Sequence, residues 1–281
     1  MKATVKAILL LLVATAATAK AQDVERPVLS AYTLEAGSAH IADTYLTPLK
    51  YYGQNYALGY ERMQAMRFNP DRWVMRLKGR LSLERVKSPA RNSLMWGLGL
   101  DLGWSMMHRW RPAQQWSVMA GGYTSAEAGV LYLSRNSNNP ASAKGAWTVG
   151  VSAAAVYNGR IGRIPFCARY QAELPLTGIF FTPQYGELYY EIWLGNRSGL
   201  VHGAWPGNYF GLDNLATVDL RFGRTILRLG YRCDILSSKA NDIVSRSVTH
   251  TAVVGIASEW LSLGPSDSRK AEQARITSSL Y

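Results

Sequence analysis

Cysteine and histidine are scarce in this chain of 281 residues, which contains two cysteines and four histidines. With so few nitrogen and sulfur ligands, no cluster has the spacing of a zinc site, and no calcium-loop pattern occurs, so no metal is expected. A P-loop and a dinucleotide fingerprint are also absent, so no cofactor is expected. Beyond the first residues, no run of about 18 apolar residues occurs, which excludes transmembrane helices.

The first residues have the pattern of an export signal. Lys2 and Lys6 form a charged start, and the apolar run at 7–14 is too short to span a bilayer as a helix. Export argues against a nucleic-acid partner, so the excess of 31 Lys and Arg over 19 Asp and Glu indicates a basic lumen or a lipopolysaccharide-facing surface. The chain divides into a signal peptide at 1–21, a folded domain at 22–263 and a polar tail at 264–281.

Alternation between apolar and charged residues is the most informative pattern in the chain. From Arg72 to Glu84 the odd positions are apolar or glycine, and most even positions are charged. A β-strand directs successive side chains to opposite faces, so this long segment has one face suited to lipid and one suited to water. A second segment at 94–107 has an even stronger apolar face. The side chains expected to face lipid are Trp73, Met75, Leu77, Leu81, Leu83, Trp96, Leu98, Leu100, Leu102 and Trp104.

Twelve strands can be placed along the chain, with turn residues between them. They lie at 31–41, 52–67, 72–85, 94–107, 115–133, 145–157, 164–174, 185–194, 198–205, 214–222, 225–235 and 247–260. This pattern predicts an all-β fold, an antiparallel up-and-down transmembrane barrel of about 12 strands in the outer membrane. Ten strands remain possible if the first segment is a plug or the fifth is not a strand.

Charged residues at alternate strand positions predict an Arg-rich lumen. One interpretation is a cation-lined path for anions, and the other is a packed core of Arg–carboxylate pairs. Strand parity also places Cys167 in the lumen and Cys233 toward lipid, so both are expected to be free thiols. The charges expected in the lumen are Glu61, Arg72, Arg76, Lys78, Arg80, Glu84, Asp101, Arg169, Glu173, Asp219, Arg221, Arg228, Arg232 and Asp234.

Catalytic candidates are few. His40 has an acid nearby, Asp43, and the two suggest a base and the group that orients it. They support the alternative of a lipid- or lipopolysaccharide-modifying enzyme on the barrel wall, although an ordinary polar strand end explains them as well. The aromatic, proline-interrupted segment at 175–190 suggests a lumen plug, a binding surface or a belt at the membrane boundary.

Several short stretches resemble a known family. They read D-T-Y-L-T-P at 43–48, Y-E-R-M at 60–63, L-P-L-T-G-I-F-F-T-P-Q-Y-G-E-L-Y-Y-E-I-W at 174–193 and L-R-L-G-Y at 227–231. The chain resembles a Bacteroidota family of exported proteins known only as a domain of unknown function. That resemblance implies a small outer-membrane barrel and brings no substrate, cofactor or catalytic residue.

The function expected from these observations is non-enzymatic: a structural barrel, a narrow channel or a surface binding protein. Its partners would be outer-membrane lipid, lipopolysaccharide and the barrel assembly machinery. A soluble exported barrel or sandwich that binds a small ligand is the third possibility.

Overall fold

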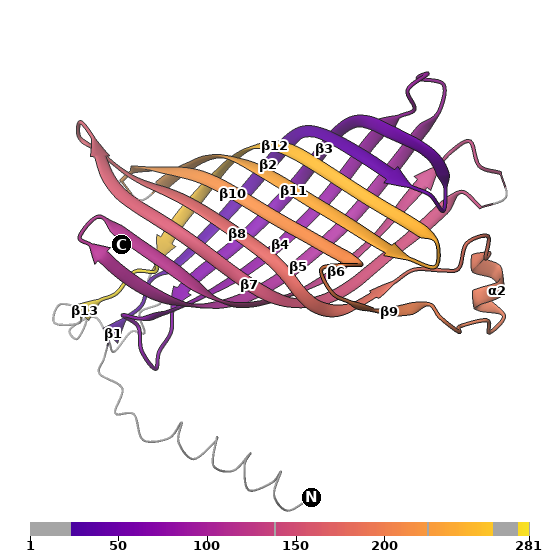
Figure 1. Cartoon of the computed structure of the whole chain (residues 1–281). Helices are drawn as coiled ribbons and strands as arrows, with labels where there is room; N and C mark the ends of the chain where they lie inside the picture. Colours follow the sequence, from indigo (N-terminus) through magenta and orange to yellow (C-terminus); the bar gives the residue numbers. More distant parts are fainter. Residues whose placement is uncertain (1–23, 138, 224, 261–274, 281) are drawn as a thin grey trace, which may run out of the picture.

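The computed structural model describes residues 24–137, 139–223, 225–260 and 275–280. The predicted signal peptide at 1–21 lies outside the described residues, as does most of the predicted tail. Ten long strands close into an antiparallel barrel (Figure 1). They are β2 (Val28–Asp43), β3 (Thr47–Ala65), β4 (Trp73–Lys87), β5 (Leu94–Ala113), β6 (Trp116–Leu133), β7 (Ala141–Ile161), β8 (Ile164–Phe181), β10 (Tyr209–Phe222), β11 (Thr225–Ala240) and β12 (Ile243–Trp260).

The topology is up-and-down, as the sequence predicts. Each long strand pairs with the next one along the chain, β8 pairs with β10, and β12 returns to pair with β2, which closes the barrel. Two further strands, β1 (Val24–Glu25) and β13 (Arg275–Ile276), form a separate parallel pair. No helix in the described part of the chain is long and apolar enough to cross a bilayer.

The barrel has ten long strands, the lower number that the sequence left open, and not the twelve that it favoured. The segment predicted as a strand at 185–194 contains the short helix α2 (Tyr189–Trp193), and the one at 198–205 contains only β9 (Val201–Ala204), which pairs with β8 alone. Positive φ angles at Gly186, Gly195 and Gly199 bend the chain there. The aromatic residues between these glycines therefore belong to a connection between β8 and β10. The first and fifth predicted segments are both strands of the barrel.

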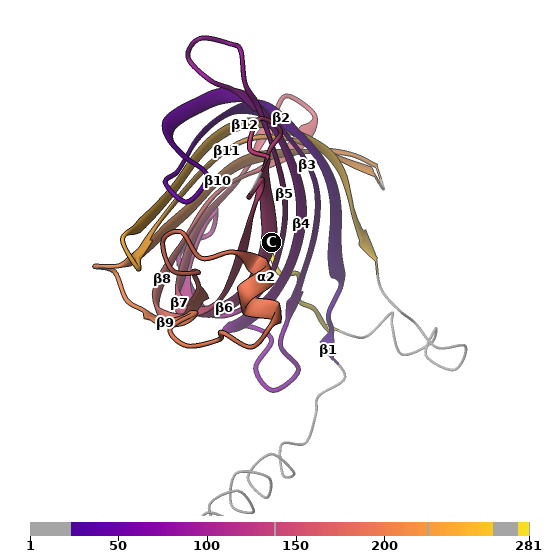
Figure 2. The ribbon, with the colours of Figure 1, turned by 90° about the vertical axis from the view of Figure 1, so that its right-hand side faces the viewer.

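The two ends of the barrel are called the near end and the far end. The near end holds β1, β13 and the connections β3–β4, β5–β6, β7–β8 and β10–β11 (Figure 1). The far end holds the other connections, including the long one from β8 to β10 with α2. Viewed from the far end, α2 and its flanking loops lie in front of the barrel mouth (Figure 2).

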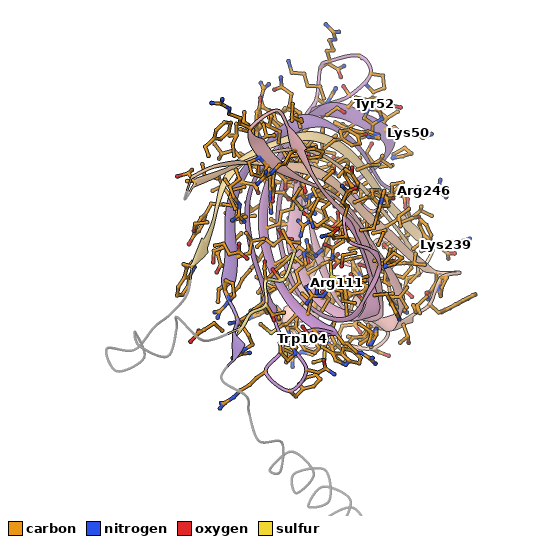
Figure 3. The ribbon with its side chains drawn as sticks, turned by 90° about the vertical axis from the view of Figure 1, so that its left-hand side faces the viewer. Lys50, Tyr52, Trp104, Arg111, Lys239 and Arg246 are labelled. Carbon is orange, nitrogen blue, oxygen red and sulfur yellow. The ribbon has the colours of Figure 1, made fainter. Side chains whose placement is uncertain are left out.

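The outer wall of the barrel is apolar. The ten side chains predicted to face lipid lie on this wall, and seven of them belong to the exposed large hydrophobic residues. Trp104 is directed outward in the view from the near end (Figure 3). Aromatic residues flank the apolar wall: on β7, Trp147 lies toward the far end and Tyr157 toward the near end. About ten residues of tilted strand separate them, which corresponds to roughly 25 Å along the barrel axis.

Candidate functional site

The near end of the lumen is filled with apolar side chains. The inward-facing residues in the middle of the barrel are polar, whereas those at the near end are apolar. Met63, Met107 and Met119 are examples, since they point inward and are fully buried. Cys167 is a buried free thiol in the same layer, and Cys233 is a half-buried free thiol. The layer consists of Leu29, Ala31, Met63, Val74, Met107, Met119, Ala154, Val156, Cys167, Ile226, Ala257 and Leu280.

Residues 277–280 complete the closure of the near end. The Arg109 Nη1 group donates to the carbonyl oxygens of Ser278 and Ser279, at 2.7 and 3.1 Å. Asn158 donates through Nδ2 to the carbonyl oxygen of Leu280 at 2.9 Å. Leu280, 3% exposed, packs into the apolar layer. The C-terminal segment is thus part of the lumen filling. The sequence placed it in a polar tail.

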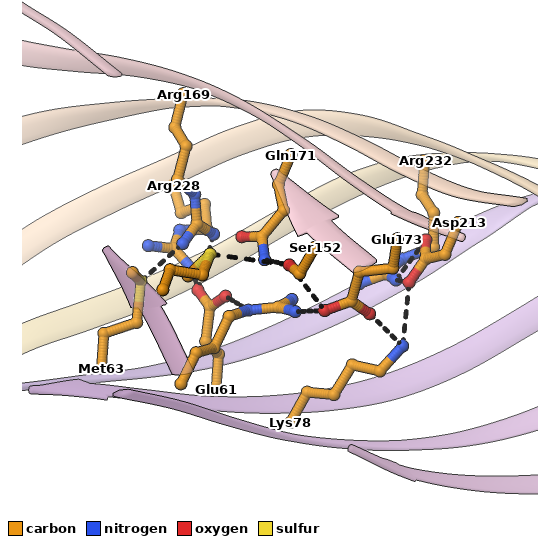
Figure 4. A network of polar contacts seen from close by, with 12 residues as sticks. Glu61, Met63, Lys78, Ser152, Arg169, Gln171, Glu173, Asp213, Arg228 and Arg232 are labelled. Carbon is orange, nitrogen blue, oxygen red and sulfur yellow. Dashed lines mark hydrogen bonds and ion pairs between the residues drawn. The ribbon is translucent and has the colours of Figure 1, made fainter. Parts of the chain in front are cut away.

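A network of ion pairs fills the middle of the lumen. Glu61 accepts hydrogen bonds from Arg76, Arg169 and Arg228, with nitrogen–oxygen distances of 2.5, 2.7 and 2.5 Å (Figure 4). Arg228 also binds Asp219 through two nitrogens, each at 2.7 Å. Three guanidinium groups on three strands therefore share one carboxylate. Such charge-assisted hydrogen bonds satisfy groups that would be costly to bury alone.

Lys78 is the centre of the second half of the network. Its Nζ lies 2.8 Å from Glu173 and 3.1 Å from Asp213 (Figure 4). It also lies 2.8 Å from Asp101. Gly103 makes room for this side chain, because a Cβ at that position would lie 2.6 Å from the Lys78 Cε atom. Arg232 and Arg80 extend the network toward β2 by binding Glu35, at 3.1 and 2.9 Å.

Ion pairs between strands that are not neighbours in the sheet show that side chains cross the lumen. Arg76 on β4 reaches Glu173 on β8 at 2.7 Å, although these two strands do not pair in the sheet. Arg169 on β8 reaches Glu61 on β3 in the same way. The ion pairs therefore cross the lumen, and they form the packed core that was one of the two interpretations open from the sequence.

Most of the predicted lumen charges are brought together in this region. Arg72 is an exception, since it lies exposed in the β3–β4 turn. Arg221 lies at the near end, where it binds Glu259 at 2.9 Å. The other predicted charges face the interior: Glu61, Arg76, Lys78, Arg80, Glu84, Asp101, Arg169, Glu173, Asp219, Arg228, Arg232 and Asp234.

Three carboxylates of the ion-pair network and the cavity lining were missed from the sequence. Glu35 lies among small residues, so the sequence does not show clearly which face of the strand it belongs to. It is an even number of positions from Ala31 and Ala39, which are buried, and therefore shares their face. Asp213 stands one residue before the predicted tenth strand. Glu127 follows the pair of glycines at 121–122, which obscured the alternation in β6. Continuing the alternating pattern of each predicted strand by a few residues would have identified all three carboxylates.

A cavity of about 200 Å³ lies between the ion-pair network and the far end. Two inward-facing glycines, Gly99 and Gly211, form part of its wall. Asp101 and Asp234 expose 23% and 37% of their side chains, which inside the barrel is exposure to this cavity. Its other polar and aromatic lining includes Lys78, Arg80, Glu84, Tyr123, Glu127, Glu173, Phe180, Tyr209, Asp213, Arg232 and Thr249.

The connection that contains α2 is anchored at the mouth of this cavity. The Tyr45 hydroxyl donates to the carbonyl oxygen of Glu187 at 2.6 Å, and the Ala143 N–H donates to the Tyr189 hydroxyl at 2.6 Å. Burial raises the pKa of Tyr189 to about 12, so this hydroxyl stays protonated at neutral pH. Phe180 is buried beside Tyr209. One part of the predicted 175–190 segment thus packs into the barrel, while Tyr185 and Tyr190 remain exposed.

His40 and Asp43 do not form the catalytic pair that the sequence suggested. His40 is exposed on the outer wall, where its ring contacts Tyr52 edge-on. Asp43 is fully buried inside the barrel, where it binds Lys144 and the hydroxyls of Ser142 and Ser245. The two lie on opposite faces of β2, because they are three positions apart along the strand. No group of three or more His, Cys, Asp or Glu arranged for a metal occurs among the described residues.

Comparisons with known proteins give a family and similarly shaped structures. The outer membrane protease OmpT from Escherichia coli has 4% identity and a TM-score of 0.47, with 86% of this chain and 98% of that chain covered. The translocator domain of the autotransporter NalP from Neisseria meningitidis has 8% identity and a TM-score of 0.39, with 92% and 96% covered. The COG4313 outer membrane channel from Pseudomonas putida F1 has 10% identity and a TM-score of 0.32, with 87% and 98% covered.

At these TM-scores the three structures support no conclusion about what this chain does. No curated protein matches the chain. A family model matches residues 5–267, nearly the whole chain, and the chain therefore belongs to the family described as "Protein of unknown function (DUF3316)".

Proposed function

We propose that this protein is a non-enzymatic outer-membrane barrel that binds a small molecule in its lumen and does not conduct ions. The observation that carries this proposal is the unequal filling of the lumen. The near end is filled by the apolar layer and residues 277–280, the middle by ion pairs, and a cavity remains toward the far end. A pore needs a path through all three regions, whereas a binding site needs only one opening.

The outer wall supports a membrane location. It carries apolar side chains such as Leu81, Leu100 and Val151, each more than 40% exposed. A soluble barrel or sandwich would leave this wall in water, where so large an apolar surface favours aggregation. Outer-membrane lipid and lipopolysaccharide are therefore the proposed neighbours of the wall, after export and insertion by the barrel assembly machinery. The near end, with short turns, would face the periplasm.

The same structure disfavours the two alternatives on the barrel fold. A cation-lined anion path needs free cations along the lumen, but Arg76, Lys78 and Arg228 are each held by two or more carboxylate groups. A surface enzyme of the His–Asp type needs its two residues in contact, but His40 faces outward and Asp43 inward. Binding without chemistry agrees with both observations.

Single-channel recording tests this proposal directly. The purified chain, refolded into a planar bilayer, is expected to give no conductance steps at low or high salt. Insertion is checked separately with spin labels at Leu81→Cys and Leu100→Cys, which should be relaxed by bilayer-dissolved oxygen. Labels at the turn residue Arg67→Cys should instead respond to an aqueous relaxant. Salt-dependent conductance steps from inserted protein would overturn the non-conducting role.

A further inference from the structure

The cavity contains more carboxylates than cations. Its inward-facing cations are Lys78, Arg80 and Arg232, and all three are ion-paired within the network. Lys144 at its edge is bound by Asp43, and Arg246 is exposed on the outer face of β12. The carboxylates in the lining are Glu84, Asp101, Glu127, Glu173, Asp213 and Asp234.

The carboxylates that the ion-pair network holds least are Glu127 on β6 and Asp234 on β11. Glu127 stands directly opposite Asp101 in the β5–β6 ladder, so their side chains enter the lumen together. Glu127 accepts a hydrogen bond from the Tyr209 hydroxyl at 3.1 Å and makes no ion pair among the described residues. Asp234 lies 3.6 Å from Arg80, its nearest cation, and its side chain is open to the cavity. Two carboxylates are therefore available to a cation.

A second observation points independently to a ligand. Thr249, 3% exposed, lines the cavity, and its hydroxyl has no hydrogen-bond partner among the described residues. Arg80 lines it too. More than nine-tenths of its side chain is buried, and its Nη2 group has no partner in the part of the chain that the structure describes. Thr249 is the direct cross-strand partner of Asp234. Buried polar groups without partners are costly, and a ligand that hydrogen-bonds to them removes that cost.

The aromatic side chains and the volume of the cavity favour an organic cation. Tyr123, Phe180 and Tyr209 are buried in or beside the lining, and aromatic faces attract organic cations. The volume of about 200 Å³ is far larger than a bare metal ion needs and gives room for on the order of seven non-hydrogen atoms. An organic ammonium group with a short polar chain fits these dimensions and this charge.

We propose that the cavity binds a small molecule with a protonated amine and a hydrogen-bonding oxygen. The ammonium group would lie between Glu127 and Asp234, and the oxygen would interact with Arg80 and Thr249. This inference rests on the proposed function, since it names the chemical class of the molecule held in the closed lumen.

A matched series of three probes of equal length tests the class. They are 5-amino-1-pentanol, which is cationic, 1,5-pentanediol, which is neutral, and 5-hydroxypentanoate, which is anionic. Binding to the full chain in a non-ionic detergent is followed by saturation-transfer NMR. The amine is expected to bind about 10-fold more tightly than the diol, because a hydrogen bond to a charged group replaces one to a neutral group. The anion is expected to bind most weakly.

Two variants locate the site. Glu127→Gln is expected to weaken binding of the amine about 10-fold and to leave the diol unchanged, because it removes a charge and keeps the shape. Thr249→Val is expected to weaken amine and diol alike. Glu191→Gln on α2, outside the cavity, is the control and should change neither. Glu127 forms no ion pair with any residue that the structure describes, so its replacement should preserve folding, which heat-modifiable gel mobility verifies.

The outcomes separate the two proposals. Equal binding of amine and diol, or an amine affinity insensitive to Glu127→Gln, overturns the ligand class and leaves a closed binding barrel in place. Failure of all three probes to bind overturns the assignment of this cavity as a binding site for such molecules. Conductance steps in the bilayer recording overturn the closed barrel itself.

Discussion

Arg228 and Asp219 are direct cross-strand partners on β11 and β10. Inside the lumen the guanidinium group of Arg228 donates hydrogen bonds to both carboxylate oxygens of Asp219. Both are about 98% buried, and Arg228 also holds Glu61. Replacing Arg228 with Met keeps most of its volume but leaves the Asp219 carboxylate without a cation. We expect this change to lower the free energy of unfolding by about 3–5 kcal/mol, measured by urea unfolding in lipid vesicles.

A double-mutant cycle shows whether this loss comes from the unpaired charge. Asp219→Leu with Arg228→Met should be less destabilising than the sum of the two single changes, because no buried charge is left unpaired at this pair. If the losses in free energy of unfolding of the two single variants simply add in the double variant, the broken ion pair is not the cause of the loss.

Gly103 provides a second test, one of packing against the network. A Cβ added there would lie 2.6 Å from the Cε and 2.9 Å from the Cγ of Lys78, whose Nζ is held by three carboxylates. We expect Gly103→Ala to displace Lys78 and lower the free energy of unfolding by about 1–3 kcal/mol, in the same unfolding assay.

Gly79 is the matched control for this substitution. A Cβ there meets only Leu102 Cδ2, at the ordinary contact distance of 3.6 Å. Gly79→Ala should therefore leave stability unchanged or raise it by about 0.4–1 kcal/mol through the unfolded chain. Equal effects of the two substitutions would rule out crowding at Lys78 as the explanation.

The barrel could be predicted from the sequence because its signal is local. In the middle of β4 and β5 the alternation of side chains is clear, so residues such as Leu81 and Arg80 reveal their faces without knowledge of their neighbours. The number of strands was harder to predict from the sequence. The glycines with positive φ between β8 and β10 bend a chain segment whose aromatic residues otherwise suit a strand.

The site could be predicted only in part, because its contacts are long-range. Alternation predicts that Arg76 and Glu173 both face the lumen, but their ion pair depends on which strands stand opposite in a closed barrel of ten. The apolar near end was missed for a related reason. Met63 and Met107 point inward, where the polar side of the alternation was expected, and only the closing chain segment explains them.

Arg109 is expected to hold the C-terminal segment in the near end. Its guanidinium binds two carbonyl oxygens of that segment. In a background of Cys167→Ala and Cys233→Ala, Leu280→Cys should be protected from a water-soluble maleimide, because Leu280 is buried. Adding Arg109→Ala should make it reactive, with at least about a 10-fold rise in labelling rate from the loss of two charge-assisted hydrogen bonds.

An exposed position calibrates the labelling. Arg67→Cys in the β3–β4 turn should react rapidly with or without Arg109. Rapid labelling of Leu280→Cys in the presence of Arg109 would show that the segment does not fill the lumen, and the non-conducting role would lose one of its two supports.

Tyr189 is expected to make the α2 connection sensitive to alkaline pH. Burial raises its pKa from 10.0 to about 12. The folded state therefore holds the phenolic proton more tightly than the unfolded chain does. The stability that Tyr189 contributes is present below pH 10 and is lost as the pH rises through about 12. Tyrosinate absorbance should show one tyrosine titrating near pH 12, where the buried phenolate charge destabilises the packing of the loop.

Two variants on the same helix separate this residue from the other tyrosines. Tyr189→Phe should remove the titration step near pH 12 and should speed proteolysis of the β8–β10 connection at neutral pH, because the acceptor for Ala143 is gone. Tyr190→Phe changes an exposed ring and should do neither. If Tyr189→Phe leaves the step in place, the buried hydroxyl is not its origin, and the anchor of this loop over the cavity must lie elsewhere, with Tyr45 and its bond to Glu187 as the next candidate.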